Sequence, residues 1–234
     1  MSALKWCYNR PTAIYRLTAS LGTSDGICAV RISERGRSAR SPRIIAEQSG
    51  TTYLFYLTNR TEFEHGGCSA LHRVQLVDGK VDTPETIKVL VESVWEPVTR
   101  ESFPGLFVFE LPDKPFLAVR DSEGKEATFV CMTSMWRSQE RLVTVRVHDG
   151  RVESHYADQS QNLGVFGTDG GSRVVGLTSG PTALPQLCIG EAELSNGVLR
   201  FHWQAVKKWQ PSLESSVIGE QRASRYERWK PSCS

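Results

Sequence analysis

The chain has 234 residues and a formal net charge of +2, with 39% hydrophobic and 23% charged residues. These values are ordinary for a globular protein and allow a sizeable core, in one large domain or two small ones. They give no electrostatic case for a nucleic-acid partner, because phosphate binding requires a concentrated basic face, so none is expected. No apolar run reaches the length of a membrane span and the N-terminus lacks a signal pattern, so we expect a cytoplasmic protein without membrane contact.

The cysteines predict neither a metal site nor a redox motif. None forms a C-x-x-C pair, and no histidine stands in a metal-ligand spacing. Reduced and mostly buried thiols are the expectation for a cytoplasmic chain. We therefore predict no metal site. The six cysteines are Cys7, Cys28, Cys68, Cys131, Cys188 and Cys233.

Taken in chain order, four segments repeat one pattern. Each has a short apolar run, a polar break, a second run and a closing turn pair. Asp-Gly and Asn-Gly supply the positive φ angles of tight hairpin turns, so each segment predicts a β-hairpin. The segments are 5–26, 53–81, 128–153 and 173–199, and they close at Asp25-Gly26, Asp78-Gly79, Asp149-Gly150 and Asn196-Gly197.

The two runs of a segment predict different strands. A continuous apolar run is typical of a strand buried on both faces, whereas an alternating run is typical of a strand with one wet face. In the third segment, Val143, Val145 and Val147 fall on one side of the second run. Thr144, Arg146 and His148 fall on the other side, which we expect to face water.

The repeat predicts an all-β fold. The turn pairs recur at intervals of about 50 residues with one longer interval, which fits four-stranded propeller blades with one insertion. We therefore expect a partial β-propeller of about four antiparallel blades over residues 1–200. Residues 201–234 are expected to be the end of the last blade or an irregular C-terminal tail, locally basic but interrupted by glutamates.

The stretch GTSDG at residues 22–26 matches the G-x-S-x-G pattern of a serine hydrolase, with Ser24 as the nucleophile. That motif requires a strand before it and a helix after it. Here ICAVRIS follows, which is strand-like, and too few residues precede Ser24 for the sheet of an α/β-hydrolase. A hairpin turn is the favoured interpretation, and a hydrolase using Ser24 is the weak alternative.

Residues 82–98, DTPETIKVLVESVWEPV, fit either a helix or a strand. Thr83 and Pro84 could begin a helix, with Ile87 and Val91 on one face. However, the segment is crowded with β-branched residues that also alternate, which favours a strand.

The remaining chemistry-bearing residues predict no catalytic site. No carboxylate pair shares a face suited to acid–base work, and His72 and His148, at matching repeat positions, suggest a surface or strand-face role. The glycines at 164–167 and 170–171 form no phosphate-binding pattern and predict loops. The tryptophans lack interleaved basic strands and are expected to pack in the core or between blades. They are Trp6, Trp95, Trp136, Trp203, Trp209 and Trp229.

With the repeat in view, the sequence resembles the β-propeller of the acylaminoacyl-peptidases, or acylamino-acid-releasing enzymes, in the prolyl oligopeptidase family. The resemblance extends over roughly residues 4–200. It is carried by CYNRPTAIYRL (7–17), SPRI (41–44), ESFPGLF (101–107), the segment 121–147 and VVGLTSGPTALPQLCIGE (174–191).

The resemblance implies a propeller that covers the active site of a C-terminal serine-hydrolase domain and admits only short peptides. That domain releases the N-acylated residue without a metal or organic cofactor. It assigns no catalytic residue to this sequence, which we expect to be a propeller fragment without the hydrolase domain and inactive alone. The expected partners are such a hydrolase domain or further blades, and short N-acylated peptides. A stand-alone β-propeller that binds another protein is the alternative.

Overall fold

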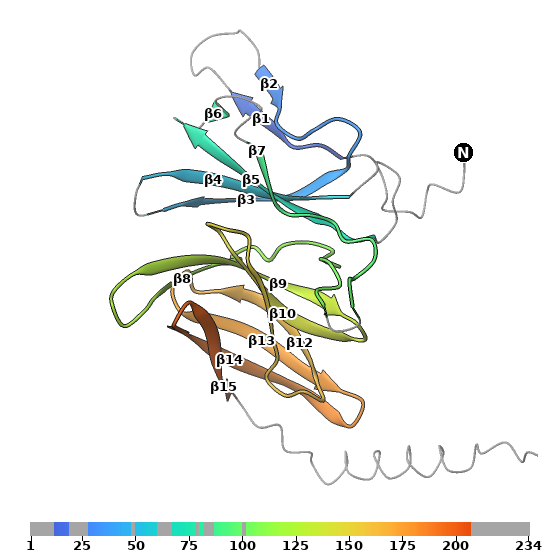
Figure 1. Cartoon of the computed structure of the whole chain (residues 1–234), viewed down its shortest axis with the longest axis vertical. Helices are drawn as coiled ribbons and strands as arrows, with labels where there is room; N and C mark the ends of the chain where they lie inside the picture. Colours follow the sequence, from blue (N-terminus) through green and yellow to red (C-terminus); the bar gives the residue numbers. More distant parts are fainter. Residues whose placement is uncertain are drawn as a thin grey trace, which may run out of the picture.

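The computed structural model describes residues 12–18, 28–47, 50–59, 67–77, 80–81, 87–99 and 102–206. Their regular elements are all β-strands, and the strands pair antiparallel in four sheets. The sheets are stacked face to face in chain order, from β1 and β2 at one end to β15 at the other (Figure 1). The prediction of an all-β partial propeller is confirmed.

The sheets differ in their number of strands. The N-terminal sheet has two strands, β1 (Tyr15–Thr18) and β2 (Cys28–Arg31). The first blade follows in the order β3-β4-β5-β6, with β7 also pairing with β5. Its strands are β3 (Ala39–Ala46), β4 (Thr52–Thr58), β5 (Ala70–Val77), β6 (Lys80–Val81) and β7 (Ile87–Val91).

The second and third blades are four-stranded sheets whose strands pair in chain order. The second blade contains β8 (Phe116–Arg120), β9 (Glu126–Trp136), β10 (Gln139–Arg146) and β11 (Val152–His155). The third blade contains β12 (Asn162–Thr168), β13 (Arg173–Gly180), β14 (Ala183–Ser195) and β15 (Val198–Ala205).

The two predicted turn pairs within the described residues connect the third strand of a blade to the fourth. Asn196 and Gly197 have φ values of 51° and 72° and join β14 to β15, as an Asn-Gly hairpin turn requires. Gly150, with φ 78°, lies between β10 and β11. The turns at Asp25-Gly26 and Asp78-Gly79 lie outside the described residues, as does Ser24.

The continuous apolar runs are strands buried on both faces, as predicted. In β9, Phe129 and Cys131 pack between the second and third blades, whereas Val130 and Met132 pack between the first and second blades. Successive side chains of a strand point to opposite faces, so a strand with dry surroundings on both sides must be apolar at every position.

The prediction of a wet face on the second run is wrong at Thr144, which is 1% exposed. Leu142 and Val143, its neighbours on β10, are fully buried in different cores, one on each side of the second blade. The strand therefore lies between two other sheets, and burial by the third blade overrides its polar alternation. Clean alternation occurs instead in β14, where Cys188, Ala192 and Leu194 point inward.

The insertion in the repeat is the linker between β7 and β8. Leu106, Val108 and Leu111 of this linker are almost fully buried in the core between the first and second blades. A single antiparallel bridge, between Ser69 and Leu106, ties the linker to the first blade. The longest interval of the repeat thus contains a packed segment that fills the space between two blades.

Residues 82–98 and residues 164–167 both contribute strands. The strand interpretation of residues 82–98 is confirmed for Ile87–Val91, which form β7. The loop interpretation of residues 164–167 is wrong, because they lie in β12, where the register with β13 shifts between Val165 and Gly167. A bulge of this kind tolerates the glycines that weaken the strand signal.

The turn at Gly150 packs so closely on the first blade that we expect alanine there to destabilise the fold. A Cβ at Gly150 would overlap the carbonyl oxygen of Leu90, whereas Gly124 has nearly the same φ and open space around it. Gly124→Ala should lower the free energy of unfolding by about 1 kcal/mol through its φ alone, and Gly150→Ala by about 3 kcal/mol. Urea unfolding followed by tryptophan fluorescence measures both, and equal losses would contradict this contact.

Candidate functional site

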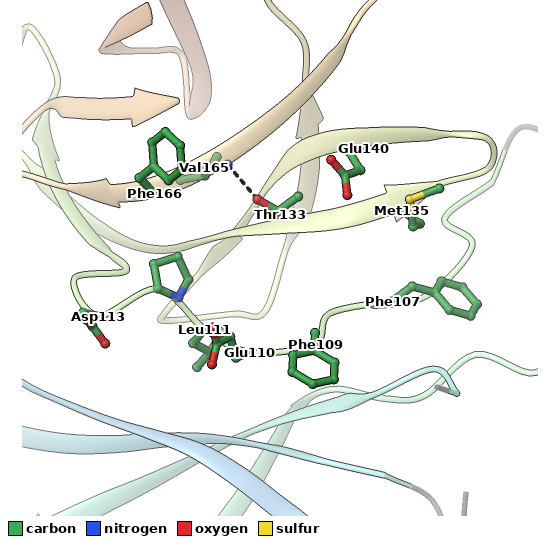
Figure 2. Close-up of a pocket in the computed structure, with 11 residues that line it drawn as sticks. Phe107, Phe109, Glu110, Leu111, Asp113, Thr133, Met135, Glu140, Val165 and Phe166 are labelled. Atoms are coloured by element: carbon green, nitrogen blue, oxygen red, sulfur yellow. Dashed lines mark hydrogen bonds between the residues drawn. The ribbon is translucent and has the colours of Figure 1, made fainter. Parts of the chain in front are cut away.

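A pocket of about 450 Å³ opens where the linker meets the second and third blades. Figure 2 shows it bordered by the linker on one side and by β9, β10 and β12 on the other. The linker contributes Phe107, Phe109, Glu110, Leu111, Pro112 and Asp113, the β9–β10 hairpin contributes Thr133, Met135 and Glu140, and β12 contributes Val165 and Phe166.

The innermost strand of the first blade, β3, holds the linker in place with two arginines. Arg40 donates to the carbonyl oxygens of Val108 and Phe109, at 2.9 and 2.8 Å. Arg43 donates to the carbonyl oxygens of Leu111 and Pro112, each at 2.6 Å. Charge-assisted hydrogen bonds of this kind are stronger than neutral ones, so the linker backbone is fixed along the pocket.

A β-bulge makes this arrangement possible. Residues three apart in a regular strand point to opposite faces, but the register of β3 with β4 shifts between Arg40 and Arg43. Ser41, inside the bulge, has a positive φ of 53°, and its Oγ accepts a hydrogen bond from the backbone of Leu111 at 3.2 Å. The bulge thus allows both arginines to reach the same linker.

The far side of the pocket is also held by hydrogen bonds. The amide of Phe107 donates to Ser134 Oγ at 3.0 Å, and the amide of Val165 donates to Thr133 Oγ1 at 2.7 Å. These bonds join the linker and β12 to β9. The pocket is therefore built by contacts between three parts of the chain that are distant in sequence.

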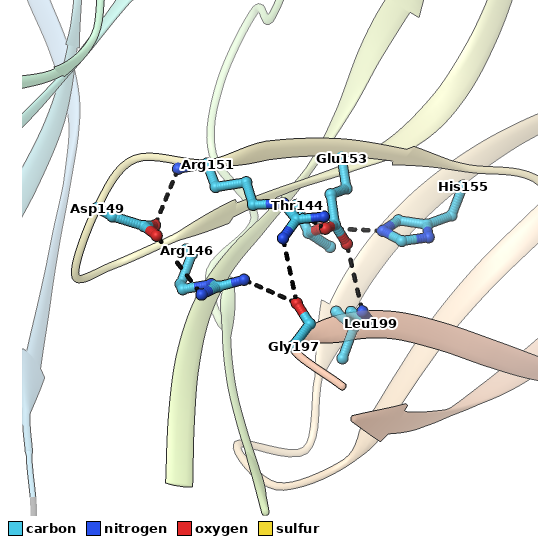
Figure 3. A network of polar contacts seen from close by, with 8 residues as sticks. All are labelled: Thr144, Arg146, Asp149, Arg151, Glu153, His155, Gly197 and Leu199. Atoms are coloured by element: carbon cyan, nitrogen blue, oxygen red, sulfur yellow. Dashed lines mark hydrogen bonds and ion pairs between the residues drawn. The ribbon is translucent and has the colours of Figure 1, made fainter. Parts of the chain in front are cut away.

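At the outer edge, a polar network joins the second blade to the third (Figure 3). Arg146 donates to the carbonyl oxygen of Gly197 at 2.8 Å, and Glu153 accepts from the amide of Leu199 at 3.3 Å. Arg151 lies 2.9 Å from the same glutamate. Since these contacts reach backbone groups of the β14–β15 hairpin, they fix how the two blades are positioned relative to each other.

Buried His72 and half-buried His155 form hydroxyl–imidazole pairs that resemble half of a catalytic triad. Thr58 Oγ1 lies 2.9 Å from His72 Nε2, and Thr144 Oγ1 lies 2.9 Å from His155 Nε2. Both threonines are 1% exposed, so no substrate can reach their hydroxyl groups. The pairs satisfy polar groups between neighbouring strands. They cannot act as nucleophile and base on a substrate.

The surroundings of these histidines favour the neutral imidazole. Burial lowers the pKa of His72 to about 4, and the positive charge of Arg37 adds to the effect. Burial also lowers the pKa of His155 to about 4. Tyr56 stacks on the His72 ring with the centroids 4.9 Å apart, and burial raises the pKa of its hydroxyl group to about 12.

The predicted surface or strand-face role divides between the two matching histidines. His72 is fully buried on a face of β5, whereas His148 is exposed at the surface, so the two do not occupy equivalent environments. His202 is exposed and pairs with Glu193 at 2.9 Å on β14. His65 lies outside the described residues.

The tryptophans only partly follow the prediction that they pack in the core or between blades. Trp136 and Trp203 pack against the inter-blade cores as predicted, but Trp95 is 70% exposed, so the packing prediction is wrong there. Trp6, Trp209 and Trp229 lie outside the described residues. Free thiols are buried at Cys68, Cys131 and Cys188 and exposed at Cys28.

The described residues contain neither a metal-binding cluster nor a membrane-spanning helix. No group of three histidine, cysteine or carboxylate side chains in this part of the chain could hold a metal ion. No helix among the described residues is long and apolar enough to cross a bilayer.

The pocket itself was not found from the sequence. Its apolar residues come from the linker, from the β9–β10 hairpin and from β12, part of which was predicted to be a loop because of its glycines. The only signal was indirect. SPRI (41–44), a string that carries the family resemblance, contains Arg43, which holds the linker at Leu111 and Pro112. Phe107, the last residue of ESFPGLF (101–107), lines the pocket.

Stacked antiparallel sheets that follow one another along the chain define it as a β-propeller domain of partial extent. The chain belongs to the family described as "Acylamino-acid-releasing enzyme, N-terminal domain", whose model matches residues 2–217. The resemblance drawn from short sequence strings is therefore confirmed.

Two relatives are named acylamino-acid-releasing enzymes and come from plants. The chain is 26% identical over 212 residues to the acylamino-acid-releasing enzyme of Arabidopsis thaliana, covering 87% of this chain and 27% of that protein. It is 22% identical over 231 residues to acylamino-acid-releasing enzyme 1 of Oryza sativa subsp. japonica, covering 92% and 28%. The chain thus spans little more than a quarter of the length of these relatives.

Among solved structures, a thermostable family-43 glycoside hydrolase matches with a TM-score of 0.42 and 12% identity. The match covers 80% of this chain and 65% of the hydrolase chain.

The depressed histidine pKa values predict a loss of stability in acid. Between pH 6.5 and 4 the unfolded chain binds protons that neutral His72 and His155 do not, so the free energy of unfolding should fall as the pH falls. Urea unfolding at a series of pH values from 7.5 to 4.5 measures this decline. His72→Gln should make the decline shallower, and the exposed control His148→Gln should not. If the free energy of unfolding fell equally with pH in all three proteins, the decline could not be attributed to His72.

Proposed function

We propose that the chain is part of a propeller that restricts access of N-acylated peptides to the serine-hydrolase domain of an acylamino-acid-releasing enzyme. The observation that carries the proposal is the family match over residues 2–217. The two plant relatives are named as enzymes that release acylamino acids, and this chain corresponds to about a quarter of each. The hydrolase domain would be the partner that supplies the nucleophile and its base.

The position of the pocket supports this role. The blades of a propeller surround a central channel, which the first strand of each blade borders. Here the pocket is lined by β12, by the β9–β10 hairpin and by the linker that precedes β8, and β3 holds that linker. A pocket that includes the first strand of one blade and the segment leading to the first strand of another lies where a peptide passing along the channel would make contact.

The proposal assigns no peptidase activity to the chain by itself. The two buried hydroxyl–imidazole pairs, Thr58–His72 and Thr144–His155, are closed to substrate. Ser24 lies outside the described residues, and its interpretation as a turn residue stays a prediction.

A chromogenic N-acetyl-alanine substrate tests the absence of activity. We expect the purified chain to release no more chromophore than its Ser24→Ala variant, because neither protein offers an activated nucleophile. Turnover by the unmodified chain that disappears in Ser24→Ala would overturn this part of the proposal.

The restriction of access needs a test with the catalytic partner. The purified chain is added to the isolated hydrolase domain of the Arabidopsis relative. The kcat/KM is then measured for acetyl-alanine anilide and for a long N-acetylated peptide. We expect the chain to lower cleavage of the long peptide more than that of the short substrate. An unchanged ratio of the two values would contradict the proposed role.

One observation favours a second function, a stand-alone module that binds another protein. The outer face of the third blade carries apolar side chains beside its charged ones, with Leu187 and Ile189 of β14 exposed by 40% and 37%. At the other end of the stack, Tyr15 and Leu17 of β1 are exposed by 52% and 65%. In a propeller such faces pack against neighbouring blades, so uncovered faces favour association.

Association through the third blade predicts a concentration-dependent mass in light scattering. Ile189→Lys should shift the protein toward the monomer because it places a charge among the apolar side chains of this face. The matched control is Val98→Lys, which makes the same kind of change at a residue that is 94% exposed on the linker. A monomer at all concentrations, or an equal effect of both variants, would contradict the second function.

A further inference from the structure

The pocket beside the linker gathers apolar side chains that have little cover. Phe109 and Phe166 are exposed by 77% and 61%, and Phe107 and Met135 by 40% and 37%. Figure 2 shows Phe107 and Phe109 on the linker side, with Met135 and Phe166 across the pocket from them. Large apolar side chains that line one hollow are typical of a binding site for apolar groups.

The charge of the lining is entirely negative. Glu110, Asp113 and Glu140 line the pocket, and no lysine, arginine or histidine is found among the described residues that do so. Asp113 is paired with Arg43 at 3.1 Å. Glu110 and Glu140 are exposed and form no ion pair with any residue that the structure describes. The lining therefore offers two carboxylates to a cation from outside.

The pocket is formed before any ligand binds. The linker backbone is fixed by Arg40 and Arg43, and β12 is fixed to β9 through Thr133. A ligand would thus not have to order the backbone on binding, which removes one of the usual costs of association. The hydrogen bonds leave the phenyl rings and the free carboxylates directed to solvent.

We propose that this pocket binds a peptide segment that carries a lysine or arginine next to an aromatic or aliphatic residue. The inference rests on the proposed function, which supplies a peptide as the occupant. The apolar side chain would pack among Phe107, Phe109 and Phe166, and the cation would pair with Glu110 or Glu140. A guanidinium or ammonium group is also attracted to the face of an aromatic ring, so the two kinds of lining residue act on the same ligand.

An N-acylated peptide has lost the positive charge of its amino terminus, so the cation that the pocket selects must be a side chain. A basic residue within the blocked peptide would therefore favour its capture. Acidic peptides are disfavoured, because a further carboxylate near Glu110 and Glu140 meets like charge.

Fluorescence polarisation with the full chain tests the inference. Three labelled N-acetylated peptides are used, identical except for a lysine, glutamine or glutamate beside one phenylalanine. We expect the lysine peptide to bind about 5-fold more tightly than the glutamine peptide at low salt. The glutamate peptide should bind most weakly, and the differences should shrink at high salt because exposed ion pairs are screened.

Three variants separate the two parts of the pocket. The double variant Glu110→Gln/Glu140→Gln should abolish the preference for lysine and leave the affinity for the glutamine peptide unchanged. Phe109→Ala should weaken the binding of both peptides. Glu123→Gln is the matched control, because it removes an exposed carboxylate in the turn between β8 and β9, away from the pocket. All substituted residues are exposed, so their loss should not unfold the protein.

The outcomes distinguish this inference from the proposed function. Equal binding of the lysine and glutamate peptides, or no binding of any peptide, would overturn the inference. A lysine preference that survives in the double variant would overturn it as well. If the lysine peptide binds selectively but the chain does not change the ratio of kcat/KM values of the hydrolase domain, the binding site is supported. The proposed restriction of access would then be refuted.

Discussion

The fold depends on the packing of the second blade between two other sheets. Neighbouring residues of β9 belong to different cores: Phe129 and Cys131 pack toward the third blade, and Val130 and Met132 pack toward the first. Neither core can form without this sheet, because each takes one of its two faces. Polar groups that fall within this layer, such as Thr144, must find a partner inside the protein, and His155 provides it.

The same packing determines where the pocket lies. The linker follows the first blade and places Leu106, Val108 and Leu111 in the core that this blade shares with the second. Since these side chains point inward, Phe107, Phe109 and Glu110 are left facing the opening. The arginines of the β3 bulge then fix the linker backbone. Alternation along an extended segment thus produces both a packed core and a lined pocket.

The polar contacts have two separate roles in this architecture. Buried pairs such as Thr58–His72 satisfy polar groups inside the stack and keep the imidazole neutral. The outer network around Arg146 and Glu153 connects adjacent blades through backbone groups of the β14–β15 hairpin. The free carboxylates at the pocket, Glu110 and Glu140, belong to neither role, and they are the charges that a ligand could use.

The sequence by itself determined the all-β class, the turns at Gly150 and Asn196-Gly197, the strand at Ile87–Val91 and the family. These features depend on local backbone preference or on short strings that need no knowledge of neighbours. Only the tertiary structure decided that His72 and Thr144 are buried, that the glycines of β12 lie in a strand, and that a pocket forms. The physical reason is that burial and pocket shape depend on which sheets pack together, and residues far apart in the sequence decide that packing.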